Sequence, residues 1–121
     1  MKPPIIDRHQ DEIIVISPND VSKLFHTRLK NARFGELRPT KSNWKSIQIL
    51  ALTSVLDACK DIEELCRISR ANIVRGHKRN KGFFYIQSHN ISCQGESEPK
   101  IASIVELCSQ FLWYEVYLEF E

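Results

Sequence analysis

The stretch NWKSIQILALTSVLDAC, residues 43–59, decides the fold of this chain. Between residues 47 and 59, nine of the thirteen residues are apolar, and in a helix they would lie on nearly every side. Such a helix has to be covered by other elements on nearly every side, and it is too short for a bilayer, which needs about 20 residues. We therefore predict a central core helix over 43–59, with Leu50, Leu52 or Leu56 fully buried.

Length and composition are those of an ordinary globular domain. The chain has 121 residues, of which 42% are hydrophobic and 26% charged. Pro3 and Pro4 predict a flexible lead-in over 1–11, followed by a single α+β domain over 12–121. The sequence has no apolar run of signal-peptide or membrane-span length, so we expect a cytoplasmic protein without a membrane partner.

Sequence periodicity predicts the remaining elements. Helix caps and apolar spacings of three and four predict helices from Pro18 to about Gly35, over 43–59, over 61–68 and over 97–112. Short β-branched, aromatic or alternating runs predict strands at 12–16, 72–75, 83–87, 91–94 and 113–120. The order β-α-α-α-β-β-β-α-β predicts an α+β fold: a mostly antiparallel sheet of four to five strands with three to four helices packed on one face. The strands over 72–94 are expected to form a meander, with a hairpin turn at 76–82.

The sequence offers little for catalysis or metal binding. The four histidines lie in separate predicted elements, and the meander would put His77 and His89 at opposite ends of its sheet. His89 and Cys93 lack an evident third and fourth metal ligand, and the four cysteines have neither zinc nor redox spacing. We predict reduced, buried cysteines, and no catalytic residue, metal or cofactor. A small enzyme of unknown reaction is the third hypothesis.

The net charge of +2 conceals an alternation of charged blocks. Residues 23–45 carry a net charge of +6, and residues 67–81 carry six basic residues with no acid. The second block, RISRANIVRGHKRNK, leads directly into an aromatic run, FFY, at 83–85. Cations neutralise phosphates and aromatic rings stack on bases, so this segment is a candidate site for weak, non-specific nucleic-acid binding. Its residues would be Arg75, Lys78, Arg79, Lys81, Phe83 and Tyr85. The alternative is a charged, solvent-exposed turn that discourages edge pairing.

The last predicted strand has two different faces. Tyr114, Val116, Leu118 and Phe120 alternate with a second set, Trp113, Glu115, Tyr117 and Glu119. Tryptophan and tyrosine are enriched at protein interfaces, so the second set is a candidate interface, with a plain solvent-facing surface as the alternative. If this strand lies at a sheet edge, edge pairing would produce a homodimer.

These observations support two main hypotheses. The first is a small non-catalytic binding or adaptor protein that acts as a homodimer, or with another protein, through its C-terminal strand. The second is a nucleic-acid-binding regulator that uses the basic segment at 67–81.

Overall fold

A computed structural model describes the backbone of residues 5–9, 12–16 and 27–120, and the side chains of residues 27–119. Its strands are β1 (Ile5–His9), β2 (Glu12–Ile16), β3 (Leu29–Phe34), β4 (Ile73–Arg75), β5 (Phe83–Ile86), β6 (Ile91–Gln94) and β7 (Val116–Phe120). Its helices are α1 (Trp44–Cys59), α2 (Ile62–Ser69), α3 (Glu98–Leu112) and a short 3-10 turn, η2 (Gln87–His89). The predicted α+β class is confirmed.

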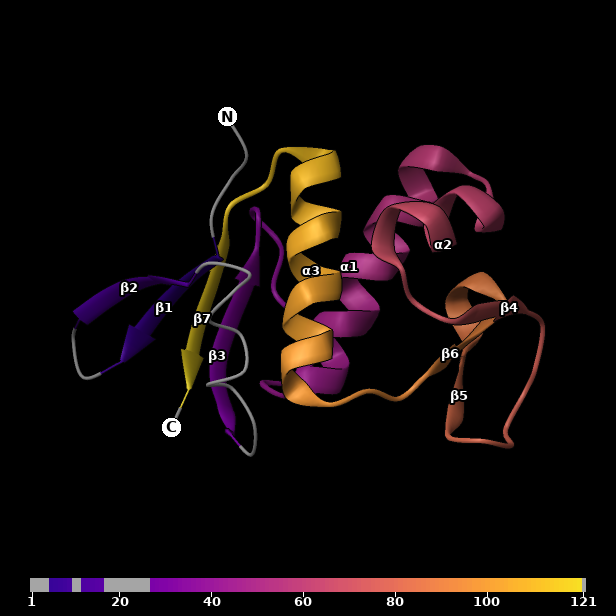
Figure 1. Ribbon diagram of the computed structural model, residues 1–121, viewed down its shortest axis with the longest axis horizontal. Coiled ribbons are helices and arrows are strands. Elements are labelled where there is room, and N and C mark those ends of the chain that lie inside the picture. The colour runs from indigo at the N-terminus through magenta and orange to yellow at the C-terminus, as the bar shows by residue number, and fades with distance from the viewer. Residues whose placement is uncertain (1–4, 10–11, 17–26, 121) are drawn as a thin grey trace.

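The strands form two sheets rather than the single sheet that we predicted. One sheet has the order β2-β1-β7-β3, and the other has the order β4-β6-β5. The two sheets lie at opposite ends of the long axis of the molecule, with α1 and α3 between them and α2 beside the second sheet (Figure 1). A central helix with apolar residues on most sides needs cover from several directions, and one sheet cannot supply it.

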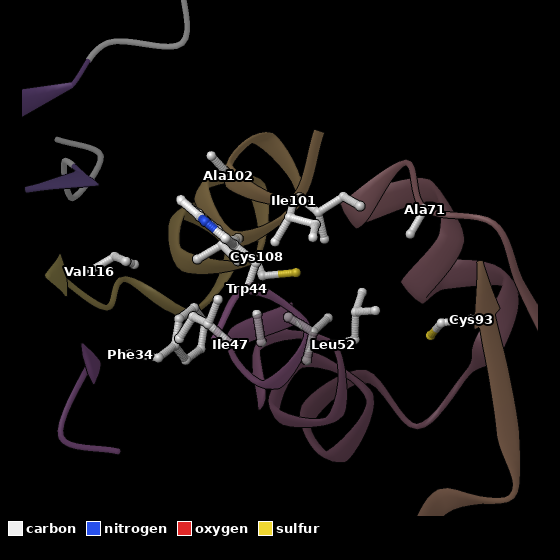
Figure 2. Close-up of a cluster of buried hydrophobic side chains, with 14 of the residues drawn as sticks. Phe34, Trp44, Ile47, Leu52, Ala71, Cys93, Ile101, Ala102, Cys108 and Val116 are labelled. Carbon is white, nitrogen blue, oxygen red and sulfur yellow. The ribbon is translucent and has the colours of Figure 1, made fainter. Parts of the chain in front are cut away.

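Helix α1 occupies the centre, as predicted. Asn43 caps it, since its side chain accepts a hydrogen bond from the Ser46 amide, and Leu52 is fully buried while Leu50 and Leu56 are half-buried. Figure 2 shows the core extending from Phe34 and Val116 in the first sheet, past Leu52 and the helices, to Cys93 in the second. The caps of the other two helices, Asp61 and Ser97, also lie where the sequence predicted them.

The helix predicted from Pro18 to Gly35 is wrong over its second half, because Leu29–Phe34 is strand β3. Residues 17–26 lie outside the described part of the chain. A β-bulge between Leu29 and Asn31 places Leu29 and Ala32 on the buried face, although they are three residues apart. That spacing imitates a helical turn, which explains the incorrect prediction.

Two further strand predictions need correction. β6 lies between β4 and β5, so residues 76–82 form a crossover and not a hairpin turn. β7 pairs with β1 in parallel and with β3 antiparallel, so it is an interior strand and not an edge. At the N-terminus, strand β1 (Ile5–His9) lies within the predicted lead-in, where we expected no strand. The flexibility of residues 1–11 stays a prediction.

Candidate functional site

The face of the first sheet turned away from the helices carries a linked group of polar side chains. Arg33 on β3 stands opposite Tyr117 on β7, and its guanidinium carbon lies 3.9 Å from the centroid of the tyrosine ring. The Tyr117 hydroxyl donates a hydrogen bond of 2.7 Å to Glu115 Oε2. That bond raises the pKa of Tyr117, and burial adds to the rise, while Arg33 opposes it. An arginine, an aromatic ring and a carboxylate are thus held together on one surface.

Two shallow hollows flank this group, and Arg33 lines both. The first, of about 370 Å³, is also lined by Asn31, Arg38, Tyr117 and Glu119. The second, of about 390 Å³, has a lining that includes Glu36, Leu37, Trp113 and Glu115. The four residues predicted from the C-terminal strand therefore all line these hollows. We call this surface the outer β3–β7 face: Asn31, Arg33, Glu36, Leu37, Arg38, Trp113, Glu115, Tyr117 and Glu119.

Trp113 is the most exposed large apolar side chain of the described residues, at 67% exposure. We had predicted that Trp113 begins the last strand. It is instead the C-terminal cap of α3, in a left-handed conformation with φ of 60°. Leu37, 45% exposed, lines the same hollow. Leu37 follows β3 in a turn, where its backbone pairs with that of Phe34. This turn places the Leu37 side chain at the same hollow as Trp113.

Sequence reasoning missed five members of this face: Asn31, Arg33, Glu36, Leu37 and Arg38. Arg33 fell within the helix predicted from Pro18 to about Gly35, and both arginines were counted in the basic block at 23–45 rather than in a protein interface. The alternation from Ala32 to Phe34 is the sequence signal that would place Arg33 on the outer face of a strand.

The second candidate surface is formed by the basic crossover, residues 76–82, which hydrogen bonds hold against the second sheet. The Ser92 hydroxyl, fully buried, donates to the Gly76 carbonyl at 2.7 Å and accepts from the Lys78 amide at 2.8 Å. At the other end, Gln94 Nε2 donates to the Lys81 carbonyl at 3.2 Å. The crossover is therefore anchored at both ends.

The anchored crossover brings a lysine and a histidine against aromatic rings. Lys78 Nζ lies 4.4 Å from the centroid of the Phe83 ring, and the ring centroids of His77 and Tyr85 are 4.4 Å apart. Phe83 and Tyr85, predicted to stack on bases, thus contact residues of their own crossover. Alternation along β5 turns Phe84 to the other face of the sheet, where it packs against the core.

A cation from the first basic block lies on the opposite face of the second sheet. Lys45, at the start of α1, places its Nζ 4.5 Å from the centroid of the Phe84 ring. Within the described ranges, no carboxylate forms an ion pair with Lys45 or with the four predicted cations of the crossover region. We call the four predicted cations of the crossover region the basic surface: Arg75, Lys78, Arg79 and Lys81.

His89 lies in a hydrogen-bonded array that the sequence did not indicate. Its Nε2 lies 2.7 Å from Asp57 Oδ1 on α1, and its Nδ1 lies 2.6 Å from Ser88 Oγ. His77 and His89 also lie at the same end of the second sheet, because β6 is its central strand; we had predicted opposite ends. Aspartate, histidine and serine in this order can activate a nucleophile. This array lies outside both hollows, however, and we interpret it as a link between α1 and the turn before β6.

The described residues give little basis for a metal site or a membrane segment. No group of three histidine, cysteine, aspartate or glutamate side chains in that part of the chain could hold a metal ion. None of the described helices has the length and hydropathy needed to cross a bilayer. All four cysteines are free; Cys93 and Cys108 are buried, whereas Cys59 and Cys66 are half-buried rather than buried as predicted.

Comparison with known proteins finds no matching family model, no matching curated protein and no matching solved structure.

Proposed function

We propose that this protein is a small non-catalytic binding protein that self-associates through the outer β3–β7 face. The observation that carries the proposal is the pair of exposed apolar side chains, Trp113 and Leu37, at one hollow beside Arg33. Tryptophan and arginine are the residues most often found at the energetic centre of protein interfaces. An apolar pair surrounded by charged groups is the usual layout of such a centre and its rim.

The charges of this face favour a second copy of the chain as the partner. Arg33 and Arg38 lie on the same surface as Glu115 and Glu119. In a twofold contact, a surface meets itself, so it needs both signs of charge in order to be complementary. A face suited to a partner of a single charge sign would carry mostly the opposite sign. The contact would use the side chains of this face and not the edge of β7, because β7 is paired on both sides.

The test is the molar mass in solution, measured by light scattering and sedimentation over a wide range of protein concentrations. We expect a dimer at micromolar concentration that Trp113→Asn combined with Leu37→Ser converts to a monomer. Asparagine suits the left-handed conformation of position 113, so this change removes the indole ring with little backbone cost. Phe111→Ser is the matched control, because Phe111 is 42% exposed but lines neither hollow.

Two results would overturn the proposal. One is a monomer mass for the parent protein at every accessible concentration. The other is a dimer that the Phe111 variant weakens as much as the Trp113 and Leu37 variant does. Thermal melts of each variant by circular dichroism would establish that the compared proteins are folded.

The four unpaired thiols support a reducing, cytoplasmic location as part of this proposal.

A further inference from the structure

We propose that the basic surface binds single-stranded nucleic acid, mainly through the sugar–phosphate backbone. This proposal goes beyond self-association, and it rests on different residues. The surface takes its cations from one segment of the chain, the end of β4 and the crossover that follows it. They are Arg75, Lys78, Arg79 and Lys81.

The first argument is that these four cations have no carboxylate counter-charge among the described residues. Cations gathered on one surface repel one another unless an anionic partner neutralises them. A nucleic-acid backbone carries a regular row of phosphates, and each lysine or arginine that contacts a phosphate releases condensed counterions, which favours binding.

The second argument is that the crossover is ordered before any ligand arrives. The buried Ser92 hydroxyl bonds to both Gly76 and Lys78, and Gln94 bonds to the Lys81 carbonyl. The backbone that carries the cations is therefore fixed relative to the sheet. Binding then costs less conformational entropy than it would for a mobile basic tail.

The third argument is a cluster of planar groups that favours a single strand over a duplex. Arg79 Nε donates a hydrogen bond of 3.1 Å to His77 Nε2, and the His77 ring packs on Tyr85. His77 and Arg79 are exposed, so their planar groups are open to a base. A duplex keeps its bases stacked inside, whereas a single strand can place them on imidazole and guanidinium planes.

An anionic membrane surface is the other partner that cations could fit, and the apolar side chains argue against it. Membrane-surface binding combines cations with apolar side chains that enter the bilayer. The large exposed apolar residues of the described part are Leu37, Phe111 and Trp113, and none belongs to the second sheet or its crossover.

The test is fluorescence anisotropy with labelled single strands of DNA and RNA of about 12 nucleotides, which lies within the usual site sizes for one domain. A duplex of the same sequence is the comparison, and vesicles rich in phosphatidylserine test the membrane alternative. For single strands, the slope of the logarithm of the binding constant against the logarithm of salt concentration is about −0.7 for each phosphate contacted, so four contacts predict a slope of about −2.8. We expect single strands to bind more tightly than the duplex, with DNA and RNA alike because the phosphates are shared.

Two variants with equal loss of charge make the test specific. The test variant replaces four cations of the basic surface with glutamine, at Arg75, Lys78, Arg79 and Lys81. The control variant does the same at four cations outside it, namely Arg28, Lys60, Arg67 and Lys100. We expect the test variant to lose at least about tenfold in affinity for the single strand, because each contact that is lost removes counterion release. The control should change it by less than about threefold. His77→Ala should weaken binding of the single strand and leave the duplex unchanged.

Several outcomes would overturn the proposal. The absence of binding at ~50 µM protein in low salt, where phosphate contacts are strongest, is one. Equal losses in the test and control variants would show an effect of net charge alone. Binding of the duplex as tight as that of the single strand, or preferential binding to the vesicles, would contradict the proposed partner.

Discussion

At the scale of single residues, burial of two thiols makes a clear prediction about reactivity. Burial raises the pKa of Cys93 to about 12, with a smaller contribution from nearby Cys66, and it also raises the pKa of Cys108. Only the thiolate reacts with alkylating reagents, so both residues should react very slowly at pH 8. Cys59 and Cys66 are half-buried and should react first. Mass spectrometry of peptides after timed exposure to iodoacetamide checks this, and early labelling of Cys93 would contradict it.

The same thiols predict how stability depends on pH. A thiol whose pKa is raised in the folded state favours folding below the unfolded pKa, here about 9.0, and that contribution is lost as pH rises toward the folded value. Stability should therefore fall between about pH 9 and 12, by up to about 1.4 kcal/mol per pH unit for each thiol. The measurement is the free energy of unfolding in urea at pH 8 and 10.5. Cys93→Ala should show a shallower decline than the parent, and an identical decline would exclude this cause.

Gly35 gives a prediction that separates backbone strain from a steric clash. Its φ is +62°, and an added Cβ would lie 2.9 Å from two atoms of the Tyr114 ring. Gly35→Ala should therefore cost more than the roughly 1–2 kcal/mol of the left-handed conformation alone. Gly82→Ala is the control, because Gly82 also has a positive φ but open space around it. Urea denaturation of both variants is the check, and equal losses would show that the tyrosine ring simply moves aside.

At the scale of elements, the helices could be predicted from the sequence because their signals are local. The signals for the start, the buried face and the end of a helix each involve residues that are close in sequence. Examples are the N-terminal caps, Asn43 of α1 and Asp61 of α2. The sheets could not be predicted in the same way. The position of β6 between β4 and β5, and of β7 between β1 and β3, depends on pairing between distant segments.

The two candidate surfaces show the same division. Residues adjacent in sequence, such as Arg75 to Lys81 or Glu115 to Glu119, could be grouped from the sequence alone. Arg33 joins the outer β3–β7 face, and Lys45 meets Phe84, only because distant elements meet. For Arg33, the bulge in β3 also imitated a helical spacing.

Helix α1 provides the stability prediction for this scale. Leu52 is fully buried in the core between the sheets, whereas Leu50 is half-buried. Leu52→Ala should lower the free energy of unfolding by about 2–5 kcal/mol, because it removes buried contacts and leaves a cavity. Leu50→Ala, the same change in the same helix, should cost clearly less. Urea denaturation at neutral pH measures both, and equal costs would show that α1 is not central in the way described.

At the scale of the whole molecule, the two proposed surfaces belong to different sheets, which lie at opposite ends of the long axis (Figure 1). Self-association through the outer β3–β7 face would leave the basic surface of each copy free. A dimer would then present two basic surfaces that point away from each other. Two linked sites bind a ligand that reaches both of them far more tightly than either site alone.

The last prediction joins the two proposals. A single strand long enough to reach both basic surfaces should bind the parent dimer at least about tenfold more tightly than it binds the variant Trp113→Asn with Leu37→Ser. A strand of about 12 nucleotides occupies one site, so both proteins should bind it equally. Anisotropy titrations with the two strand lengths make the comparison. If the variant weakens binding of the short strand as well, the two surfaces are coupled within one molecule, and avidity is not the explanation. If the long strand binds both proteins equally, the dimer does not present its basic surfaces to one strand.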